Sequence, residues 1–535
     1  MNEFVIKNGF ISKGDSSING SVSATTYYGD GSNLTGISGL SELLVNKTLY
    51  VDGVNGDDTT AIVGDMSKPF ATITSAKTSA SVGDLIHVRP ATYQEDDITK
   101  DGVAMYFDKG AIVHPTNAQQ TTSQKSIIDV SAYTNKLVIL GYGEFISDYS
   151  GQLAVSCIIV STDEAYIEFY KCDYTSGSNQ GVQKGSVILA HTGVNNTFIE
   201  CKGDIYKTDT NGGGSWSALR ILQGNIQFVG NVYNISTNVS GTALYVAAYS
   251  GSDFKGIGNI YCEGTVGTSI GLRMDSRGKS NWIGNIEVGV EANTYAYYTE
   301  SNYSGMSSLQ GHIKGAIWLS LGGAFNEGSY ISGLQDVYAS PNGYAITCND
   351  NSHNIIDLII SSNTKIFNIS NGLILFQGIA QTLSANQQFI NCTGGKFVFN
   401  GSVNDHSRRL TNSTITGGEV VISSDFESWG SNYPSDEYVF YVDGGTLRVE
   451  ACKIENHQTR TGSGVIEYVS GNLILNGATL VAENTSATSY SVKVTTPLNY
   501  LGYNNSFANL VVGGGGSLTN LITGGGTIIV DTDVE

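Results

Sequence analysis

The chain has 535 residues, of which 66 are glycine and only 14% are charged, and its formal net charge is −20. Ser, Thr, Asn, Gly, Val, Ile and Tyr dominate, which predicts a β protein with many turns. The acidic charge argues against binding to nucleic acid or to an anionic membrane, because both require clustered Lys and Arg. No run approaches the ~18 apolar residues of a membrane span, so we expect no membrane insertion.

Residues 1–46 are expected to be an attachment segment. The start of the chain, MNEFVIK, has no apolar stretch and no small-residue cleavage site, so we expect no secretory leader. We expect the protein to be synthesised in a bacterial host cytoplasm. Residues 21–37 read SVSATTYYGDGSNLTGI. This stretch resembles a module near the N-terminus of bacteriophage tail-fibre proteins, with GDGSNL (residues 29–34) as its core. The resemblance implies a homotrimer that is joined to other virion tail or baseplate proteins through residues 1–46.

Residues 49–95 contain an Asp- and Gly-rich turn, then Pro69-Phe70 with Thr72-Ile73, then a Gly-Asp-x-Ile-x-Val segment at residues 83–88. The order resembles the opening of pectin-lyase-like parallel β-helices. It implies a capping helix near residues 73–81 that covers the open end of the core. Because many chains of this fold have no activity, the resemblance concerns the fold alone.

The turn in this region also carries four oxygen-bearing side chains, of the kind that Ca²⁺ prefers: Asp52, Asn55, Asp57 and Asp58. Their spacing is not that of an EF-hand loop, and the terminal Glu is missing. Asx-turns explain the cluster equally well. Seven dispersed histidines show no H-x-x-H pattern. We therefore expect no metal or other cofactor, with Ca²⁺ at this turn as the alternative.

A glycine-led motif recurs between residues 203 and 314, starting at Gly203, Gly224, Gly258, Gly284 and Gly311, with spacings of 21, 34, 26 and 27 residues. The 34-residue step predicts an inserted loop within residues 236–256. The residue two places after each glycine is expected to point inward: Ile205, Ile226, Ile260, Ile286 and Ile313. The next residue is expected to form an outward ladder: Tyr206, Gln227, Tyr261, Glu287 and Lys314. Glu287 and Lys314 would then pair across adjacent coils.

A second series starts at Gly372, Gly395, Gly418, Gly445 and Gly471, with spacings of 23, 23, 27 and 26 residues. The second and fourth positions after each glycine are apolar, nearly all their neighbours are polar, and the sixth position is small. Period-two alternation predicts a strand with one buried face. Its recurrence every ~25 residues predicts one such strand per coil of a solenoid, stacked in parallel about 4.8 Å apart. A sandwich or barrel would not give these position-matched ladders.

The predicted fold is therefore all-β, a right-handed parallel β-helix over residues 47–495. Residues 496–535 contain glycine runs at 513–516 and 524–526 around two short apolar segments, and are predicted to form a C-terminal cap or trimer tip. The seven cysteines are scattered and odd in number, which indicates small buried hydrophobic residues in a protein made in a reducing compartment.

Glycoside hydrolysis requires two carboxylates roughly 5–10 Å apart. Glu263 and Glu287 are the best candidate pair, on adjacent coils of one outward face, with Asp275 expected in the loop between them. The favoured interpretation is that these glutamates are simply solvated, so no catalytic residue is assigned.

Tyrosines able to stack on sugar rings gather nearby at Tyr295, Tyr297, Tyr298 and Tyr303. Glycan recognition without cleavage needs no more than such a surface. We therefore expect a homotrimeric phage tail fibre or tailspike in the virion that binds host surface polysaccharide. The alternatives are a tailspike that depolymerises the polysaccharide, and a bacterial surface adhesin with the same solenoid, for which no export signal is visible.

Overall fold

A computed structural model of the chain describes the following residues: 46–123, 125–130, 133–148, 157–160, 164–176, 188–190, 198–209, 217–221, 224–236, 241–248, 253–264, 268–276, 279–289, 294–299, 307–319, 329–337, 343–382, 387–403, 410–411, 413–428, 438–457, 464–482, 490–494, 500–503, 506–508 and 529–530. Residues 45–535 form one compact unit. The predicted attachment segment, apart from Asn46, lies outside the described residues.

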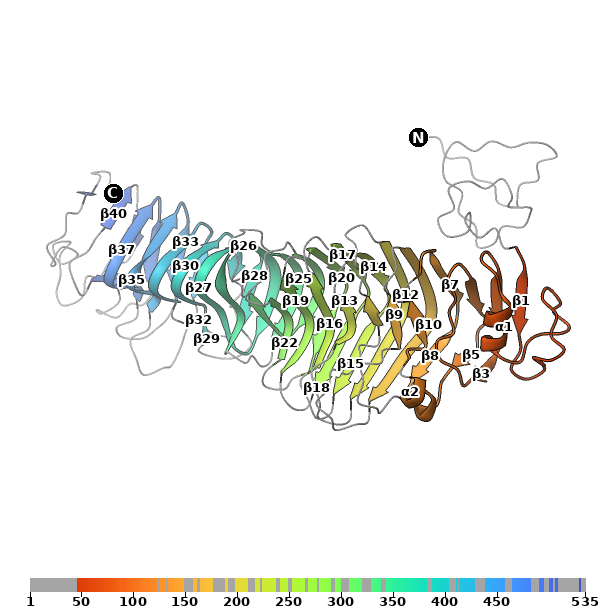
Figure 1. The fold of residues 1–535 in the computed structure, drawn as a ribbon. Helices are drawn as coiled ribbons and strands as arrows, with labels where there is room; N and C mark the ends of the chain where they lie inside the picture. The colour runs from red at the N-terminus through yellow and green to blue at the C-terminus, as the bar shows by residue number, and fades with distance from the viewer. Residues whose placement is uncertain are drawn as a thin grey trace, which may run out of the picture. The chain divides into compact units, whose positions relative to one another are not determined.

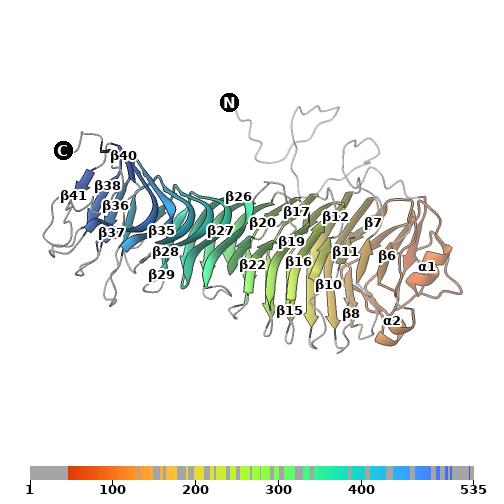
Figure 2. The same cartoon turned by 60° about the vertical axis from the view of Figure 1, so that its left-hand side comes forward.

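The chain folds as a right-handed parallel β-helix (Figure 1). A typical coil consists of β14 (Asn225–Val229), β15 (Val232–Ser236) and β16 (Gly241–Ala248). These strands pair in parallel with the corresponding strands of the next coil. Each coil therefore adds one strand to each of three faces, and Figure 2 shows the strands succeeding one another along the stack. The predicted fold class is confirmed.

The first face consists of these strands, from the N-terminal to the C-terminal coil: β1 (Thr48–Val51), β2 (Leu85–Val88), β4 (Ala104–Phe107), β7 (Leu137–Gly141), the first parts of β10 (Glu164–Ser176) and β12 (Phe198–Asp209), β14, β17 (Asp253–Ile257), β20 (Lys279–Ile283), the first parts of β23 (Ser307–Lys314) and β25 (Ser329–Val337), the later parts of β26 (Tyr344–Ser362), β27 (Lys365–Phe376), β30 (Ile390–Phe399), β33 (Ser413–Ile422), β35 (Tyr438–Glu450) and β37 (Gly464–Asn476), and β40 (Tyr500–Tyr503).

The second face consists of these strands: β3 (Ala91–Tyr93), β5 (Ala111–Val113), β8 (Glu144–Ser147), the ends of β10 and β12, β15, β18 (Ile260–Gly264), β21 (Ile286–Val288), the ends of β23, β25 and β26, β28 (Ile379–Thr382), β31 (Ser402–Val403), β34 (Phe426–Ser428), β36 (Lys453–Asn456), β38 (Thr479–Ala482) and β41 (Ser506–Ala508).

The third face consists of these strands: β6 (Ile128–Val130), β9 (Ile158–Val160), β11 (Ile188–Ala190), β13 (Ser217–Ile221), β16, β19 (Ser269–Ser276), β22 (Thr294–Thr299), β24 (Ala316–Leu319), the first parts of β26, β27, β30, β33, β35 and β37, and β39 (Tyr490–Val494), with β29 (Gln387–Gln388) and β32 (Leu410–Thr411) beside them.

The glycine-led series in the second half lies in the predicted register. Phe376 pairs with Phe399, which pairs in turn with Ile422. The same column continues through Val449 to Leu475, and all five side chains are buried. Inward side chains stack directly over their equivalents because parallel strands in register place corresponding residues about 4.8 Å apart. This ladder confirms the prediction.

The register predicted for residues 203–314 is wrong at one coil. Gly224 precedes β14 on the first face, so Gln227 pairs with Glu200 and Lys255 and does not join the outward tyrosines. The equivalent glycine is Gly230, which places Tyr233 between Tyr206 and Tyr261. The 34-residue step arises because the motif was assigned to Gly224 instead of Gly230. The prediction of an inserted loop within residues 236–256 is therefore wrong. In this coil both the first-face strand and the second-face strand begin at or directly after a Gly-Asn pair, so the sequence alone does not show which of the two glycines continues the series.

Glycine is required where these coils turn from the first face to the second. Gly258 has φ +145°, and a Cβ there would lie 1.8 Å from the carbonyl oxygen of Gly230. The next residue of each coil forms a ladder of side-chain hydrogen bonds. The Oδ1 of Asn231 accepts from the backbone N and the Nδ2 of Asn259, at 3.0 and 3.1 Å, and the Oδ1 of Asn259 accepts from the N of Asn285 at 3.2 Å. Stacked glycines and asparagines thus fix the turn of each coil.

The predicted capping helix is α1 (Ile73–Ser79). Thr72 is its N-cap, and the Thr72 side chain accepts a hydrogen bond from the N–H of Ser75. Ile73 and Ala76 are buried against the first coil. The helix ends two residues before the predicted limit of 81, because the N–H of Ala80 already bonds to Ala76 while Ala80 itself is extended. A second short helix, α2 (Asn117–Ser123), follows β5.

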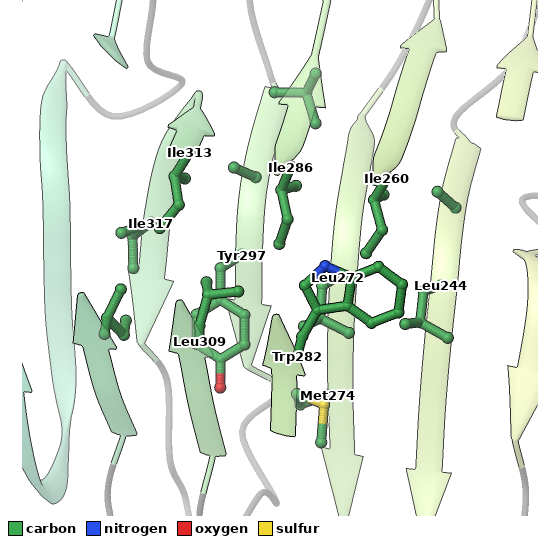
Figure 3. Packing of buried hydrophobic residues seen from close by; sticks show 14 of the residues in the cluster. Leu244, Ile260, Leu272, Met274, Trp282, Ile286, Tyr297, Leu309, Ile313 and Ile317 are labelled. Carbon is green, nitrogen blue, oxygen red and sulfur yellow. The ribbon is translucent and has the colours of Figure 1, made fainter. Parts of the chain in front are cut away.

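The interior is filled by side chains from all three faces. Figure 3 shows Ile260, Ile286 and Ile313 in line, with Trp282 and Leu272 beside them. All seven cysteines are free and buried, as expected for small core residues. At the C-terminal end, β40 and β41 add strands in residues 500–508, within the segment predicted as the cap, and β42 (Ile529–Val530) pairs with β40.

Candidate functional site

An aromatic platform, defined as Tyr295, Tyr298 and Trp318, lies on the third face. Tyr298 of β22 is in register with Trp318 of β24, and their rings are stacked at 6.4 Å with an interplanar angle of 11°. Tyr295 packs against both rings, at 5.3 Å from Tyr298 and 6.0 Å edge-on to Trp318. The three side chains are half-buried. Such rings offer apolar surface to the C–H face of a sugar and polar atoms to its hydroxyls.

Polar side chains continue from the platform along the same face. The residue beside Trp318 on the next coil is Thr347, which is buried, and the same column continues with the half-buried Asn368, Asn391 and Thr414. The Nδ2 of Asn391 donates to the Oδ1 of Asn368 at 2.7 Å. We call Asn368, Asn391 and Thr414 the polar row. They present amide and hydroxyl groups that can donate or accept hydrogen bonds.

A second column borders the polar row. The hydroxyl of Tyr344 donates to the Oε1 of Gln388 at 2.9 Å, and the Nε2 of Gln388 donates to the Oγ1 of Thr414 at 2.8 Å. The Nζ of Lys365 lies 5.2 Å from the centre of the Tyr344 ring. Burial raises the pKa of Tyr344, so its hydroxyl stays protonated at neutral pH. These contacts hold the side chains in fixed positions on a rigid sheet.

Not all of the predicted sugar-binding tyrosines lie on this platform. Tyr297 is fully buried, and its hydroxyl lies 3.3 Å from the Oγ of Ser329, so its predicted role in glycan binding is wrong. The register shifts between Tyr295 and Tyr297, and this bulge turns both Ala296 and Tyr297 inward. Tyr303 lies outside the described residues. Trp318 was not predicted, because Ala316–Leu319 is apolar at every position and has no polar alternation to mark the outward side chain.

The two candidate glutamates lie on the second face, away from the platform. Glu263 of β18 and Glu287 of β21 are on adjacent coils, as predicted. They are not directly opposite, because Glu287 pairs with Tyr261 while Glu263 contacts Gly289. Diagonal neighbours of this kind are about 7–8 Å apart. Glu287 forms the predicted ion pair with Lys314.

Asp275 does not join these glutamates. It lies in β19 on the third face, paired with Ala247, and not in a loop as predicted. Backbone pairing with β16 carries this strand through Ser276, one residue beyond Asp275. The structure therefore does not assemble the three carboxylates into one site.

The second face carries a stack of tyrosines beside these glutamates. The ring of Tyr233 lies 4.4 Å from that of Tyr206 and 4.9 Å from that of Tyr261, with interplanar angles of 6° and 4°. The Nζ of Lys171 lies 4.8 Å from the centre of the Tyr206 ring. Desolvation and the neighbouring Tyr206 raise the pKa of Tyr233 to about 12. These centroid spacings are shorter than the 6.4 Å between Tyr298 and Trp318, so the three tyrosine rings leave less of their faces open.

The predicted calcium ligands are engaged in turns before the first coil. The Oδ1 of Asp52 accepts from the backbone N–H groups of Val54 and Asn55, each at 3.0 Å. Burial opposes the charged form of Asp52, but these hydrogen bonds outweigh it and lower its pKa. Asp57 accepts from Thr59. Asp58 accepts from residues 71 and 72 at the start of α1.

Among the residues that the structure describes, no three His, Cys, Asp or Glu side chains are grouped so that they could hold a metal ion. In the same part of the chain, no helix is long and apolar enough to cross a membrane. Comparison with protein-family models, curated proteins and solved structures found no match to the chain.

Proposed function

We propose that the chain is the subunit of a homotrimeric bacteriophage tail fibre or tailspike that binds a glycan on the host surface. The resemblance of residues 21–37 to tail-fibre attachment modules supports the virion assignment. The parallel β-helix supports a stiff fibre, because each coil is fixed to its neighbours by a complete set of parallel strand pairings. Residues 1–46 would join the fibre to other virion tail or baseplate proteins.

The observation that carries glycan binding is the aromatic platform and the polar row on one face. A sugar ring stacked on Trp318 would place the next sugar of the chain toward Asn368, two coils further along the same column. A polysaccharide laid along the coils would meet new polar groups every ~4.8 Å. Binding by such a surface needs no catalytic group and little conformational change, because strands and packed side chains hold the groups in place.

The test uses the full-length protein on an array of bacterial capsular and lipopolysaccharide O-antigen polysaccharides, followed by calorimetry with any polysaccharide that binds. Trp318→Ala is expected to weaken binding at least tenfold, because the stacking surface is lost. Tyr170→Ala is the matched control, since Tyr170 is an exposed aromatic residue outside the third-face platform. Equal affinity of Trp318→Ala and the parent protein would refute the assignment of this site.

A depolymerase is the second candidate function, because Glu263 and Glu287 are diagonal neighbours at a separation within the range for glycosidases. In that case Glu263→Gln would abolish the release of new reducing ends from a polysaccharide that the protein binds, and would leave its affinity unchanged. Release that is equal in Glu263→Gln and the parent protein, or absent from both, would exclude this pair as the catalytic residues.

A further inference from the structure

Exposed aliphatic residues form a line on the first face of the β-helix. Val229, Ile257 and Ile283 pair in succession on β14, β17 and β20. Their exposed fractions are 42%, 53% and 44%. The inward positions of the same strands are already filled by large buried residues such as Phe254 and Trp282. These aliphatic side chains therefore contribute nothing to the core of the single chain.

After one coil whose outward residues in these columns are Ser308 and Gln310, the apolar surface resumes on later coils, two residues earlier along each strand. Tyr330 and Ile355 are in register and are 44% and 38% exposed. Leu375 and Val398 follow them in the same column and are half-buried. From Val229 to Val398 the line spans about 34 Å at ~4.8 Å per coil. We call these seven residues the apolar line.

The other faces differ from this one. Eight large apolar residues between positions 229 and 359 are strongly exposed, and five of them belong to the apolar line. Among the described residues of the third face there are none. An exposed apolar surface of this extent is characteristic of an interaction site.

The charges beside the apolar line balance, although the whole chain has a net charge of −20. Between β14 and β35, the described outward side chains of the first face include four basic residues and four acidic residues: Lys255, Lys279, Lys396, Arg448, Asp253, Asp357, Glu419 and Glu450. Several are paired within the chain. Lys396 lies 2.9 Å and Arg448 3.0 Å from Glu419. The net repulsion between two acidic chains is therefore small at this face.

We propose that copies of this chain pack against one another through the apolar line of the first face. The occupant must present apolar groups at the spacing of the coils, in two columns that are offset by two residues along the strands. A parallel second copy has this spacing by construction, whereas an α-helix repeats every 5.4 Å and would lose register within a few turns. Copies placed around an axis along the stack bring equivalent apolar residues together. This inference rests on the proposed homotrimer and names the face that forms it.

The experiment measures self-association and proximity in the full-length protein. Light scattering is expected to give a multiple of the 56.7 kDa chain mass at micromolar concentration. The double variant Ile257→Lys with Ile283→Lys is expected to shift this mass to that of one chain, because six added charges per trimer would be buried together. Both positions are exposed in the single chain, and unchanged circular dichroism will show that the variant is folded.

A cysteine at the line reports contact directly. All seven native cysteines are buried, so Ile283→Cys introduces the one accessible thiol. Mild oxidation is expected to link pairs of chains in Ile283→Cys. Lys365→Cys, an exposed position on the third face, is expected to stay unlinked.

A multimer that is unaffected by the lysine variants and is not linked through Ile283→Cys would overturn the proposed face and leave the trimer intact. If the parent protein has the mass of one chain, both the proposed face and the proposed homotrimer are wrong. Glycan binding on the third face is measured separately, so its failure would not be mistaken for either result.

Discussion

The middle coils and the C-terminal coils reach the same fold by different means. Between residues 203 and 336 the turns are fixed by stacked glycines and by asparagine side chains that bond from coil to coil. Glycines also stack between residues 372 and 476, where a Cβ at Gly471 would lie 2.1 Å from the carbonyl oxygen of Gly445, but there the core adds a cluster of phenylalanine rings such as Phe376 and Phe399. The asparagine ladder therefore distinguishes the first region, and aromatic packing in the core distinguishes the second. Substitutions of matched kind should therefore have different effects in the two regions.

The largest effect is expected for Gly258→Ala in the middle coils. The new Cβ would lie 1.8 Å from the carbonyl oxygen of Gly230, at a φ of +145°. We expect a loss of more than about 4 kcal/mol in the free energy of unfolding, seen as a collapse in soluble yield or in the denaturation midpoint. Gly64→Ala is the control, because its φ is +88° and nothing lies within 4 Å of the added Cβ. That variant should lose only about 1 kcal/mol, and equal losses would contradict the role of crowding.

In the C-terminal coils, Phe399→Ala should cost about 3–5 kcal/mol. Phe399 is fully buried and packs at 5.5–5.8 Å against the rings of Phe389, Phe376 and Phe426. The measurement is the unfolding rate in guanidinium, since large solenoids often unfold irreversibly. Asn400→Ala changes the adjacent exposed residue and should unfold at nearly the parent rate. If both variants unfolded alike, the ladder would not be what stabilises these coils.

The asparagine ladder should contribute less than either of these. Asn259→Ala removes the bond that its Nδ2 donates to Asn231 and the bond that its Oδ1 accepts from the backbone N–H of Asn285, and should cost about 1–2 kcal/mol. The bond from the backbone N–H of residue 259 to Asn231 is kept. Asn472→Ala, in an exposed position on a C-terminal coil, should cost under about 0.5 kcal/mol. Thermal unfolding of the two variants side by side tests the difference between the regions.

The smallest effect is expected at Glu419. Burial opposes its charged form, but hydrogen bonds from Lys396 and Arg448 outweigh burial and lower its pKa below 4.5. A carboxylate whose pKa is lowered by folding stabilises the fold above its unfolded pKa and loses that contribution as the pH falls through the folded value. Glu419→Gln should therefore unfold faster than the parent protein at pH 7, with an activation free energy lower by at most about 1 kcal/mol, and this difference should shrink as the pH falls through the folded pKa of Glu419. A difference that persists in acid would point to packing instead of charge.

The sequence was enough to predict the parallel β-helix, because a period of two within a strand and about 25 between strands can only be satisfied by stacked coils. It also predicted the inward column from Phe376 to Leu475, the capping helix at Ile73 and the pairing of Glu287 with Lys314. These features depend on local alternation or on the step from one coil to the next, and both can be read along a single chain.

Only the tertiary structure decided which strands of neighbouring coils correspond and which face each side chain joins. The sequence-based prediction started the motif at Gly224 instead of Gly230, and it therefore placed Gln227 in the outward column that Tyr233 occupies. One bulge turned Tyr297 into the core and left Tyr298 to stack on Trp318. Register and bulges depend on contacts between residues that are distant in sequence, and a shift of one residue reverses every side chain that follows it. The candidate site is therefore a property of the stacked coils, which the chain sequence alone does not specify.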